Sequence, residues 1–150
     1  MNPKDGFNYR GFALLNSEKI LTTKCYKVEN KKPICLLLTQ FDQKLIQLCK
    51  SLFKFTIFEE SINQLAQTLK PLNYDLVQDM QNGHTNETTI GTVAIQLGII
   101  KLIRYLDLEI EKFVGYSFGE ISAAYANEII DDQQAILIAY WFGIFQEKKM

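Results

Sequence analysis

Short apolar runs alternate along this chain with longer segments whose apolar residues recur at helical spacing. One run of mostly apolar residues covers positions 34–39, and a shorter candidate strand at positions 111–114 ends in the apolar pair Phe113 and Val114. Runs of this length are typical of buried parallel strands. Apolar residues three or four positions apart mark four further segments: 45–53, 62–69, 93–106 and 136–145. The order of strand, helices, strand, helix and helix predicts an α/β fold with a short parallel sheet and flanking helices.

Polar residues at the ends of these segments predict where the helices begin and end. Asp42 is a typical N-cap, and Thr56 with Glu59 has the spacing of a capping box. Pro71 closes the second helix because it lacks a backbone N–H and its ring collides with the preceding turn. The acidic and amide residues at 131–134 begin the last helix.

Residues 1–32 differ from the rest in having no long apolar run. They are interpreted as a polar connecting segment with one short amphipathic stretch at positions 9–15. Residues 82–86 have the composition of a loop. The expected organisation is therefore a connecting segment over residues 1–32 and a domain, or part of one, over residues 33–150.

The composition excludes several classes of partner. The chain has 150 residues, 47% hydrophobic and 22% charged, with a formal net charge of −1. Near neutrality predicts neither nucleic acid nor an anionic membrane surface as a partner. No run of about 18 apolar residues occurs, so no membrane span is expected. The N-terminal residues lack the apolar core of a signal peptide, and the three cysteines lack metal-ligand spacing. A cytoplasmic protein with reduced thiols and no bound metal is expected.

The sequence Gly-Tyr-Ser-Phe-Gly at positions 115–119 carries the most specific chemistry. It lies between an apolar strand and a helix of small residues, which is the setting of a nucleophile elbow. Glycines at both ends let the strand and the helix pack closely. The elbow presents Ser117 as a nucleophile at a helix N-terminus, where the backbone N–H of Phe118 points toward a developing oxyanion.

Several separated pieces of the chain resemble one family in matching order. They are residues 9–15, 32–35, 51–53, 92–98, 115–120 and 139–141. Together they are similar to the malonyl/acetyl acyltransferase domain of animal type I fatty acid synthase, preceded by the linker that follows its ketosynthase. Polyketide synthases share this domain. The resemblance implies the N-terminal half of the α/β-hydrolase-like subdomain, without the ferredoxin-like subdomain.

The resemblance also implies a reaction and its partners. In the family the elbow serine takes an acyl group from acyl-coenzyme A and passes it to the phosphopantetheine thiol of an acyl carrier domain. Ser117 matches the nucleophile and Phe118 one oxyanion donor, and Gln96 and Phe142 fall at substrate-binding positions. Acyl-coenzyme A would be a substrate rather than a permanently bound cofactor. Other domains of the fatty acid synthase would be the protein partners.

The sequence departs from the family in its general base and in its oxyanion loop. The family's histidine lies downstream of the serine, whereas His84 is the single histidine here and lies upstream. A serine without a partnered base is a weak nucleophile. The family's glycine-rich turn is replaced by residues 39–43, which puts Phe41 at the second oxyanion donor and Gln40 and Asp42 at glycine positions. Each departure predicts impaired acyl transfer.

A third departure concerns the substrate. Malonyl-loading members have an arginine after Ala-Tyr-Trp that grips the malonyl carboxylate, and Phe142 occupies that position here. Phenylalanine cannot pair with a carboxylate, so an uncharged acyl group is predicted. Two alternatives stay open beside an impaired acyltransferase of fatty acid biosynthesis. One is a non-catalytic remnant or scaffold of that domain, and the other is a serine hydrolase or thioesterase.

Overall fold

The computed structural model describes residues 9–17, 19–27, 33–40, 50–82 and 89–147. The chain divides into two compact units, Met1–Pro33 and Ile34–Met150. Each unit has secondary structure of its own, and each is considered by itself below. The candidate chemistry lies entirely in the second unit.

The described part of the first unit is a β-hairpin. Strand β1 (Tyr9–Leu15) pairs antiparallel with β2 (Ile20–Lys27). The turn is closed by Asn16, whose side chain accepts a hydrogen bond from the backbone N–H of Lys19 at 2.8 Å. The prediction of one amphipathic stretch missed the second strand, because the β-branched and polar residues of β2 bury no apolar face that would mark it. Cys25 in β2 is exposed and forms no disulfide.

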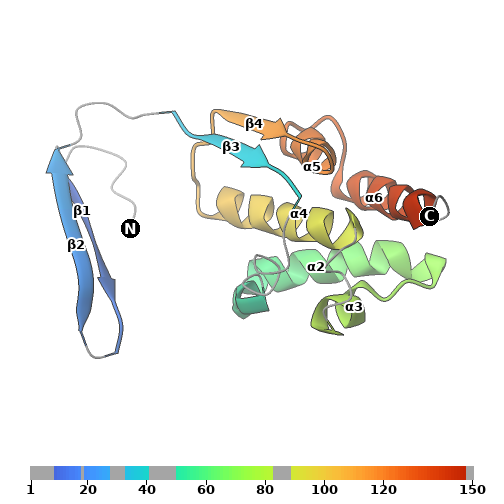
Figure 1. The fold of residues 1–150 in the computed structure, drawn as a ribbon, viewed down its shortest axis with the longest axis horizontal. Coiled ribbons are helices and arrows are strands. Elements are labelled where there is room, and N and C mark those ends of the chain that lie inside the picture. The colour runs from blue at the N-terminus through green and yellow to red at the C-terminus, as the bar shows by residue number, and fades with distance from the viewer. Residues whose placement is uncertain (1–8, 18, 28–32, 41–49, 83–88, 148–150) are drawn as a thin grey trace. The chain divides into compact units, whose positions relative to one another are not determined.

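The second unit contains a two-stranded parallel sheet, as predicted. Strand β3 (Cys35–Leu38) pairs with β4 (Lys112–Gly115), and Leu38 lies opposite Gly115. Figure 1 shows the two arrows side by side and pointing the same way. The carboxyl ends of both strands therefore meet at one edge of the sheet, which is where an α/β fold places its chemistry.

The other regular elements of the described second unit are helices. They are the 3-10 helix η1 (Lys50–Lys54), α2 (Thr56–Leu69), the 3-10 helix η2 (Lys70–Leu72), α3 (Leu76–Asn82), α4 (Thr89–Tyr105), α5 (Gly119–Ala126) and α6 (Asp132–Glu147). Figure 1 shows α4 between the sheet and α2, and α5 following β4 directly.

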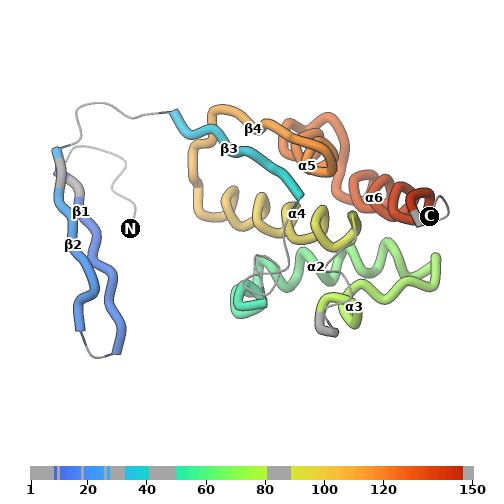
Figure 2. The backbone as a smooth tube through the Cα atoms, viewed as in Figure 1, coloured from blue at the N-terminus to red at the C-terminus, as the bar shows by residue number. Residues whose placement is uncertain are grey.

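Helix α4 is the centre of the core. Its residues from Thr89 to Gly98 are all buried, and it packs against α2, α5 and α6. A helix that is apolar on all sides is stable only when neighbours surround it, as the backbone trace in Figure 2 shows for α4. The contact with α2 is tight at Gly98, where a Cβ atom would lie 2.6 Å from the Phe58 ring. A small residue is therefore required at this crossing.

The predicted helix boundaries are partly right. Helix α2 ends before Pro71, and its buried face includes Ile62, Leu65 and Leu69 as expected. The capping box at Thr56 is wrong: the N-cap is Phe55, which forms no side-chain capping hydrogen bond. Helix α3 was not predicted, because its seven residues are too few to show a clear period. The helix predicted to begin at Asp42 and the loop at 82–86 fall largely outside the described residues.

Helix α6 keeps large apolar side chains exposed. Ile138, Trp141, Phe142 and Phe145 are each at least 45% exposed and line an open groove of about 550 Å³. A patch of this kind marks a surface suited to apolar contacts. Along the described ranges, no helix is both long and apolar enough to cross a bilayer.

Phe58 provides a direct test of the α2–α4 packing. Its side chain has no exposed surface and its ring meets that of Phe53 edge-on, with centroids 5.3 Å apart. We expect Phe58→Ala to lower the free energy of unfolding by about 3–5 kcal/mol, because the cavity cannot close around the central helix. Phe55, which is 52% exposed, is the control. Its replacement by alanine should change stability by about 0.5 kcal/mol in the same urea titration. Equal losses for the two variants would contradict this packing.

Candidate active site

The sharp turn between β4 and α5 has the geometry of a nucleophile elbow. Ser117 has a φ of 56°, in the left-handed region that side-chain-bearing residues avoid. The backbone N–H of Gly119 donates to the carbonyl of Tyr116 at 3.1 Å and closes the turn. The N–H of Tyr116 donates to the carbonyl of Leu38 at 2.9 Å, which anchors the turn to β3. Ser117 is exposed at the carboxyl edge of the sheet.

The two glycines of the elbow are required by close backbone packing. A Cβ atom on Gly115 would lie 2.5 Å from the backbone nitrogen of Glu120, inside the first turn of α5. A Cβ atom on Gly119 would overlap the carbonyl group of Leu38. Both contacts are closer than a Cβ atom can approach in a folded chain. Because the two positions are glycine, β3, β4 and α5 can meet at one point.

The elbow leaves polar groups available to a ligand. In the part of the chain that the structure describes, neither the hydroxyl of Ser117 nor the backbone N–H of Phe118 has a hydrogen-bond partner. Phe118 is the N-cap of α5, so its N–H lies at the positive end of the helix dipole. The arrangement presents a hydroxyl and an N–H donor at adjacent positions, which is what attack on a carbonyl with stabilisation of the resulting oxyanion requires.

Phe142 lies beside the elbow although 24 positions separate it from Phe118 in the sequence. The two rings meet edge-on, with centroids 5.5 Å apart and planes inclined by 73°. Phe142 is 46% exposed, so one face of its ring is open. The structure therefore brings Phe142 against Phe118, the residue that follows Ser117, and places an aromatic ring where the family resemblance places a cation.

Gln96 lies beneath the site rather than on its surface. Its side chain has no exposed area, and its amide N–H donates to the carbonyl of Thr39 at the end of β3. No local sequence pattern predicts this bond, because it joins two residues 57 positions apart. Contact between Gln96 and a substrate stays a prediction. The observed bond instead holds the Thr39 carbonyl just after β3.

Other residues named from the sequence lie outside the described part of the chain. These are Phe41, Asp42, Cys49 and His84. Their predicted roles as oxyanion donor, helix cap, thiol and loop residue stay predictions. Among the described residues, no three His, Cys, Asp or Glu side chains cluster closely enough to hold a metal ion.

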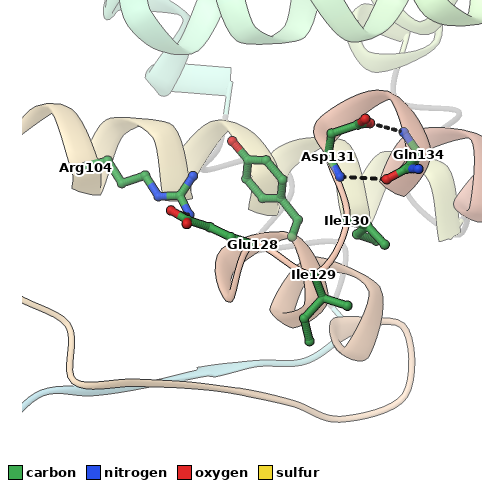
Figure 3. Close-up of a pocket in the computed structure, with 7 residues that line it drawn as sticks. Arg104, Glu128, Ile129, Ile130, Asp131 and Gln134 are labelled. Atoms are coloured by element: carbon green, nitrogen blue, oxygen red, sulfur yellow. Dashed lines mark hydrogen bonds and ion pairs between the residues drawn. The ribbon is translucent and has the colours of Figure 1, made fainter.

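A second cavity, of about 310 Å³, lies where α5 ends and α6 begins (Figure 3). Glu128 adopts a φ of 61° there, and the N–H of Ile129 donates to the carbonyl of Ala124 at 2.9 Å, as at many helix ends. Arg104 donates to the carbonyl of Ala126 at 2.9 Å. Asp131 accepts from the N–H of Gln134 at 2.7 Å. The polar groups of this cavity are thus occupied in ending one helix and beginning the next.

Tyr125 is the one described residue of this region with a shifted pKa. Burial raises the pKa of its hydroxyl above the ordinary value, Asp132 adds to the rise, and the nearby Arg104 opposes it. The guanidinium carbon of Arg104 lies 5.1 Å from the centre of the Tyr125 ring, a cation–π contact. A raised pKa keeps the phenol protonated at neutral pH, so Tyr125 is no base. The cavity is a structural junction rather than a second reactive centre.

Comparison with known proteins points to large synthases. No family model matches the chain. The chain is 30% identical over 131 residues to the reducing polyketide synthase FUB1 of Gibberella moniliformis, covering 81% of this chain and 5% of that protein. The same-named synthase of Gibberella fujikuroi is 29% identical over 130 residues. This match covers 80% of this chain and 5% of the synthase. The highly reducing polyketide synthase fogA of Aspergillus ruber is 34% identical over 99 residues, 57% of this chain and 4% of that protein. The chain therefore spans about a twentieth of these relatives.

A solved structure identifies the fold. The acyl transferase domain of ZmaA superposes with a TM-score of 0.62 at 18% identity, covering 81% of this chain and 31% of that chain. The fold is that of part of an acyltransferase domain, which confirms the fold class predicted from the sequence. Sequence and fold together show an acyltransferase-like region similar to part of polyketide synthases.

Two substitutions at Ser117 test the strained turn. Both Ser117→Gly and Ser117→Ala remove the hydroxyl, but glycine alone adopts a positive φ at no steric cost. We expect the glycine variant to be more stable than the alanine variant by about 1 kcal/mol in chemical unfolding. Equal stability of the two variants would mean that residue 117 does not keep its positive φ in solution.

Two glycine-to-alanine substitutions test the close approach of the backbone. Gly119→Ala would force a methyl group into the carbonyl of Leu38, so we expect a loss of about 1–3 kcal/mol or more. Gly143, inside α6, has only ordinary contacts at 3.8 Å to Ile90. Gly143→Ala should raise the melting temperature slightly because alanine favours the helix. A neutral Gly119→Ala would show that α5 does not contact β3 as described.

Proposed function

We propose that the chain is the N-terminal part of an acyltransferase domain of a multidomain synthase. Ser117 accepts an acyl group from acyl-coenzyme A and passes it to the phosphopantetheine thiol of an acyl carrier domain. The single observation that supports this most is the left-handed backbone of Ser117 in an exposed turn held by β3 and α5. Residues held in such a conformation often lie at catalytic sites, and the exposure of Ser117 leaves its hydroxyl accessible to a substrate.

The chemistry consists of two successive acyl transfers. The Ser117 oxygen attacks the thioester carbonyl, a C–O bond forms, and the negative charge on the former carbonyl oxygen is stabilised by the Phe118 N–H. The intermediate collapses as the C–S bond breaks, and the serine proton leaves with the coenzyme A thiol. The carrier thiol then attacks the seryl ester by the reverse sequence, and the proton returns to Ser117.

The open face of Phe142 supports an uncharged acyl group as substrate. The ring packs on Phe118 and also lines the apolar groove of α6. A malonyl carboxylate placed against this wall would lose its hydration and gain no cation from position 142, which is unfavourable by several kcal/mol, on the order of the cost of burying an unpaired charge. An acetyl or longer saturated acyl group carries no charge, so it loses no hydration of a charged group when it is placed against this wall.

The rate of the first transfer depends on a general base. His84 is the single histidine of the chain and lies upstream of Ser117, outside the family's position for the base. Without a partnered base the serine hydroxyl stays protonated, and loss of one member of a catalytic unit lowers rates by roughly 10⁴-fold. We therefore propose slow acylation for the chain by itself, with a base contributed by another part of the synthase during full turnover.

The parent synthase is a polyketide or a fatty acid synthase. The synthases reported above are polyketide synthases, which favours that class over the animal fatty acid synthase that the N-terminal segment resembles. The hairpin unit would then be part of the linker between a ketosynthase and the acyltransferase domain. The other domains of the synthase, with acyl carrier and coenzyme A thioesters, would be its partners, and the cytoplasm its location.

Mass spectrometry after incubation with acetyl- or malonyl-coenzyme A tests the proposal. We expect a 1:1 acetyl adduct on Ser117 after long incubation, less malonyl adduct, and no adduct on Ser117→Ala. Absence of an acetyl adduct under all conditions would instead support a non-catalytic remnant. Rapid release of free acetate without an accumulating ester would support a hydrolase.

Phe142→Arg provides the matched control for substrate selection. The new guanidinium would lie beside Phe118, where it can pair with a carboxylate through two hydrogen bonds. We expect the ratio of malonyl to acetyl adduct to rise by about 10-fold or more, since one charge-assisted pair is equivalent to about 1.5–3 kcal/mol. An unchanged ratio would show that position 142 does not contact the acyl group.

A further inference from the structure

The apolar groove along α6 reaches the elbow through one aromatic contact. The residues that line the groove are Ile130, Gln134, Leu137, Ile138, Trp141, Phe142 and Phe145. The ring of Phe142 packs against that of Phe118, with the centroids 5.5 Å apart, and Phe118 directly follows Ser117 in the chain. An acyl group attached to Ser117 would therefore have an apolar surface close to its point of attachment.

The groove extends along α6, mostly from Phe142 toward the start of the helix. Five of the seven lining residues precede Phe142. Ile138 lies four positions before Phe142 and Gln134 four positions before Ile138, which places the three on one face of the helix. Eight residues of helix extend about 12 Å. An extended hydrocarbon chain of about ten carbons has a similar length, because each C–C bond of about 1.5 Å adds slightly less than its own length.

The lining of the groove suits hydrocarbon and offers no partner for a charge. None of the seven residues is charged. The amide oxygen of Gln134 already accepts a hydrogen bond from the backbone N–H of Asp131 at 2.9 Å. Ile138, Trp141 and Phe142 are exposed, so their apolar surface is available to a ligand. Covering this surface with methylene groups is favourable in proportion to the apolar area removed from water.

The size of the groove suits a small molecule better than a protein. Its volume of about 550 Å³ lies within the range of about 300–1,000 Å³ that is usual for ligand pockets. A stable protein interface uses about 20–30 residues on each side, whereas seven residues line the groove. A flexible hydrocarbon chain therefore fits the groove better than a second copy of this protein does.

We propose that the α6 groove binds the hydrocarbon tail of an acyl group carried by Ser117, and that the site selects linear, uncharged acyl groups of about eight to ten carbons over acetyl groups. This inference rests on the acyl-transfer function proposed above and names its substrate class. The Ser117 oxygen bonds to the acyl carbon as the C–S bond of the coenzyme A thioester breaks, and coenzyme A leaves as the thiol with the serine proton. The tail lies along Ile138 toward Gln134.

Binding of the tail can be measured without catalysis in the Ser117→Ala variant. We expect calorimetric titration to give a dissociation constant for decanoyl-coenzyme A about 10²-fold lower than for acetyl-coenzyme A, at about twofold for each additional methylene group that the open groove covers in part. The fluorescence emission of Trp141, the single tryptophan of the chain, should shift to shorter wavelength with decanoyl-coenzyme A but not with acetyl-coenzyme A. Equal affinities, or an unchanged emission, would overturn the inference.

Two isoleucine-to-glutamate substitutions locate the tail in the groove. Ile138 is 45% exposed within the groove, whereas Ile34 is 48% exposed just before β3 and does not line it. Ile138→Glu places a charge where the tail would lie, so we expect the preference of Ser117 for decanoyl over acetyl groups to fall by about 10-fold or more. Ile34→Glu is the control and should keep the wild-type preference. A preference that Ile138→Glu leaves unchanged, or that both variants lower equally, would overturn the inference.

The results separate this inference from the function on which it rests. Acetylation of Ser117 with no preference for decanoyl groups would overturn the role of the groove and support the acyl-transfer function. Tight binding of decanoyl-coenzyme A to a chain whose Ser117 never reacts would support the groove as a site for the tail and count against acyl transfer. In analytical ultracentrifugation, a dimer that Ile138→Glu dissociates would assign the groove to a second copy of the chain and overturn the inference.

Discussion

The contact between the backbone of Gly119 and the end of β3 is the constraint on which the site depends. A Cβ atom at Gly119 would overlap the Leu38 carbonyl, so α5 can begin here only with glycine. With α5 fixed against β3, the chain has three residues in which to leave β4 and start the helix. That short connection forces Ser117 into the left-handed region and out of the sheet. The exposed hydroxyl is a consequence of backbone packing.

The site is supported by the most buried element of the protein. Helix α4 is enclosed by α2, α5 and α6, and Gln96 extends from it to the Thr39 carbonyl. Stability and site geometry are therefore coupled through one helix, because a shift of α4 would move both the core and the Thr39 carbonyl at the end of β3. The hydrogen bonds of Arg104 and Asp131, which line the second cavity, also fix where α5 ends and α6 begins. The position of Phe142 relative to the elbow depends on that junction.

The surroundings of the elbow are aromatic rather than charged. Phe118 and Phe142 meet edge-on beside the serine, and the groove along α6 continues with apolar side chains. A wall of this kind provides no cation that could compensate a carboxylate for lost hydration, which is the basis of the proposed preference for uncharged acyl groups. The exposed apolar face of α6 is a surface suited to apolar contacts.

The sequence alone determined the elements with strong local patterns. The parallel strands, the all-apolar helix before β4 and the elbow were predicted, because apolar runs and the spacing of Gly115 and Gly119 are local signals. Contacts between distant residues decided the rest. The pairing of β1 with β2, the short helix α3, the start of α2 at Phe55, the ring contact of Phe142 and the Gln96–Thr39 bond all depend on partners that no local pattern specifies. Tertiary structure decided these features because backbone direction and burial are fixed only when separate segments pack together.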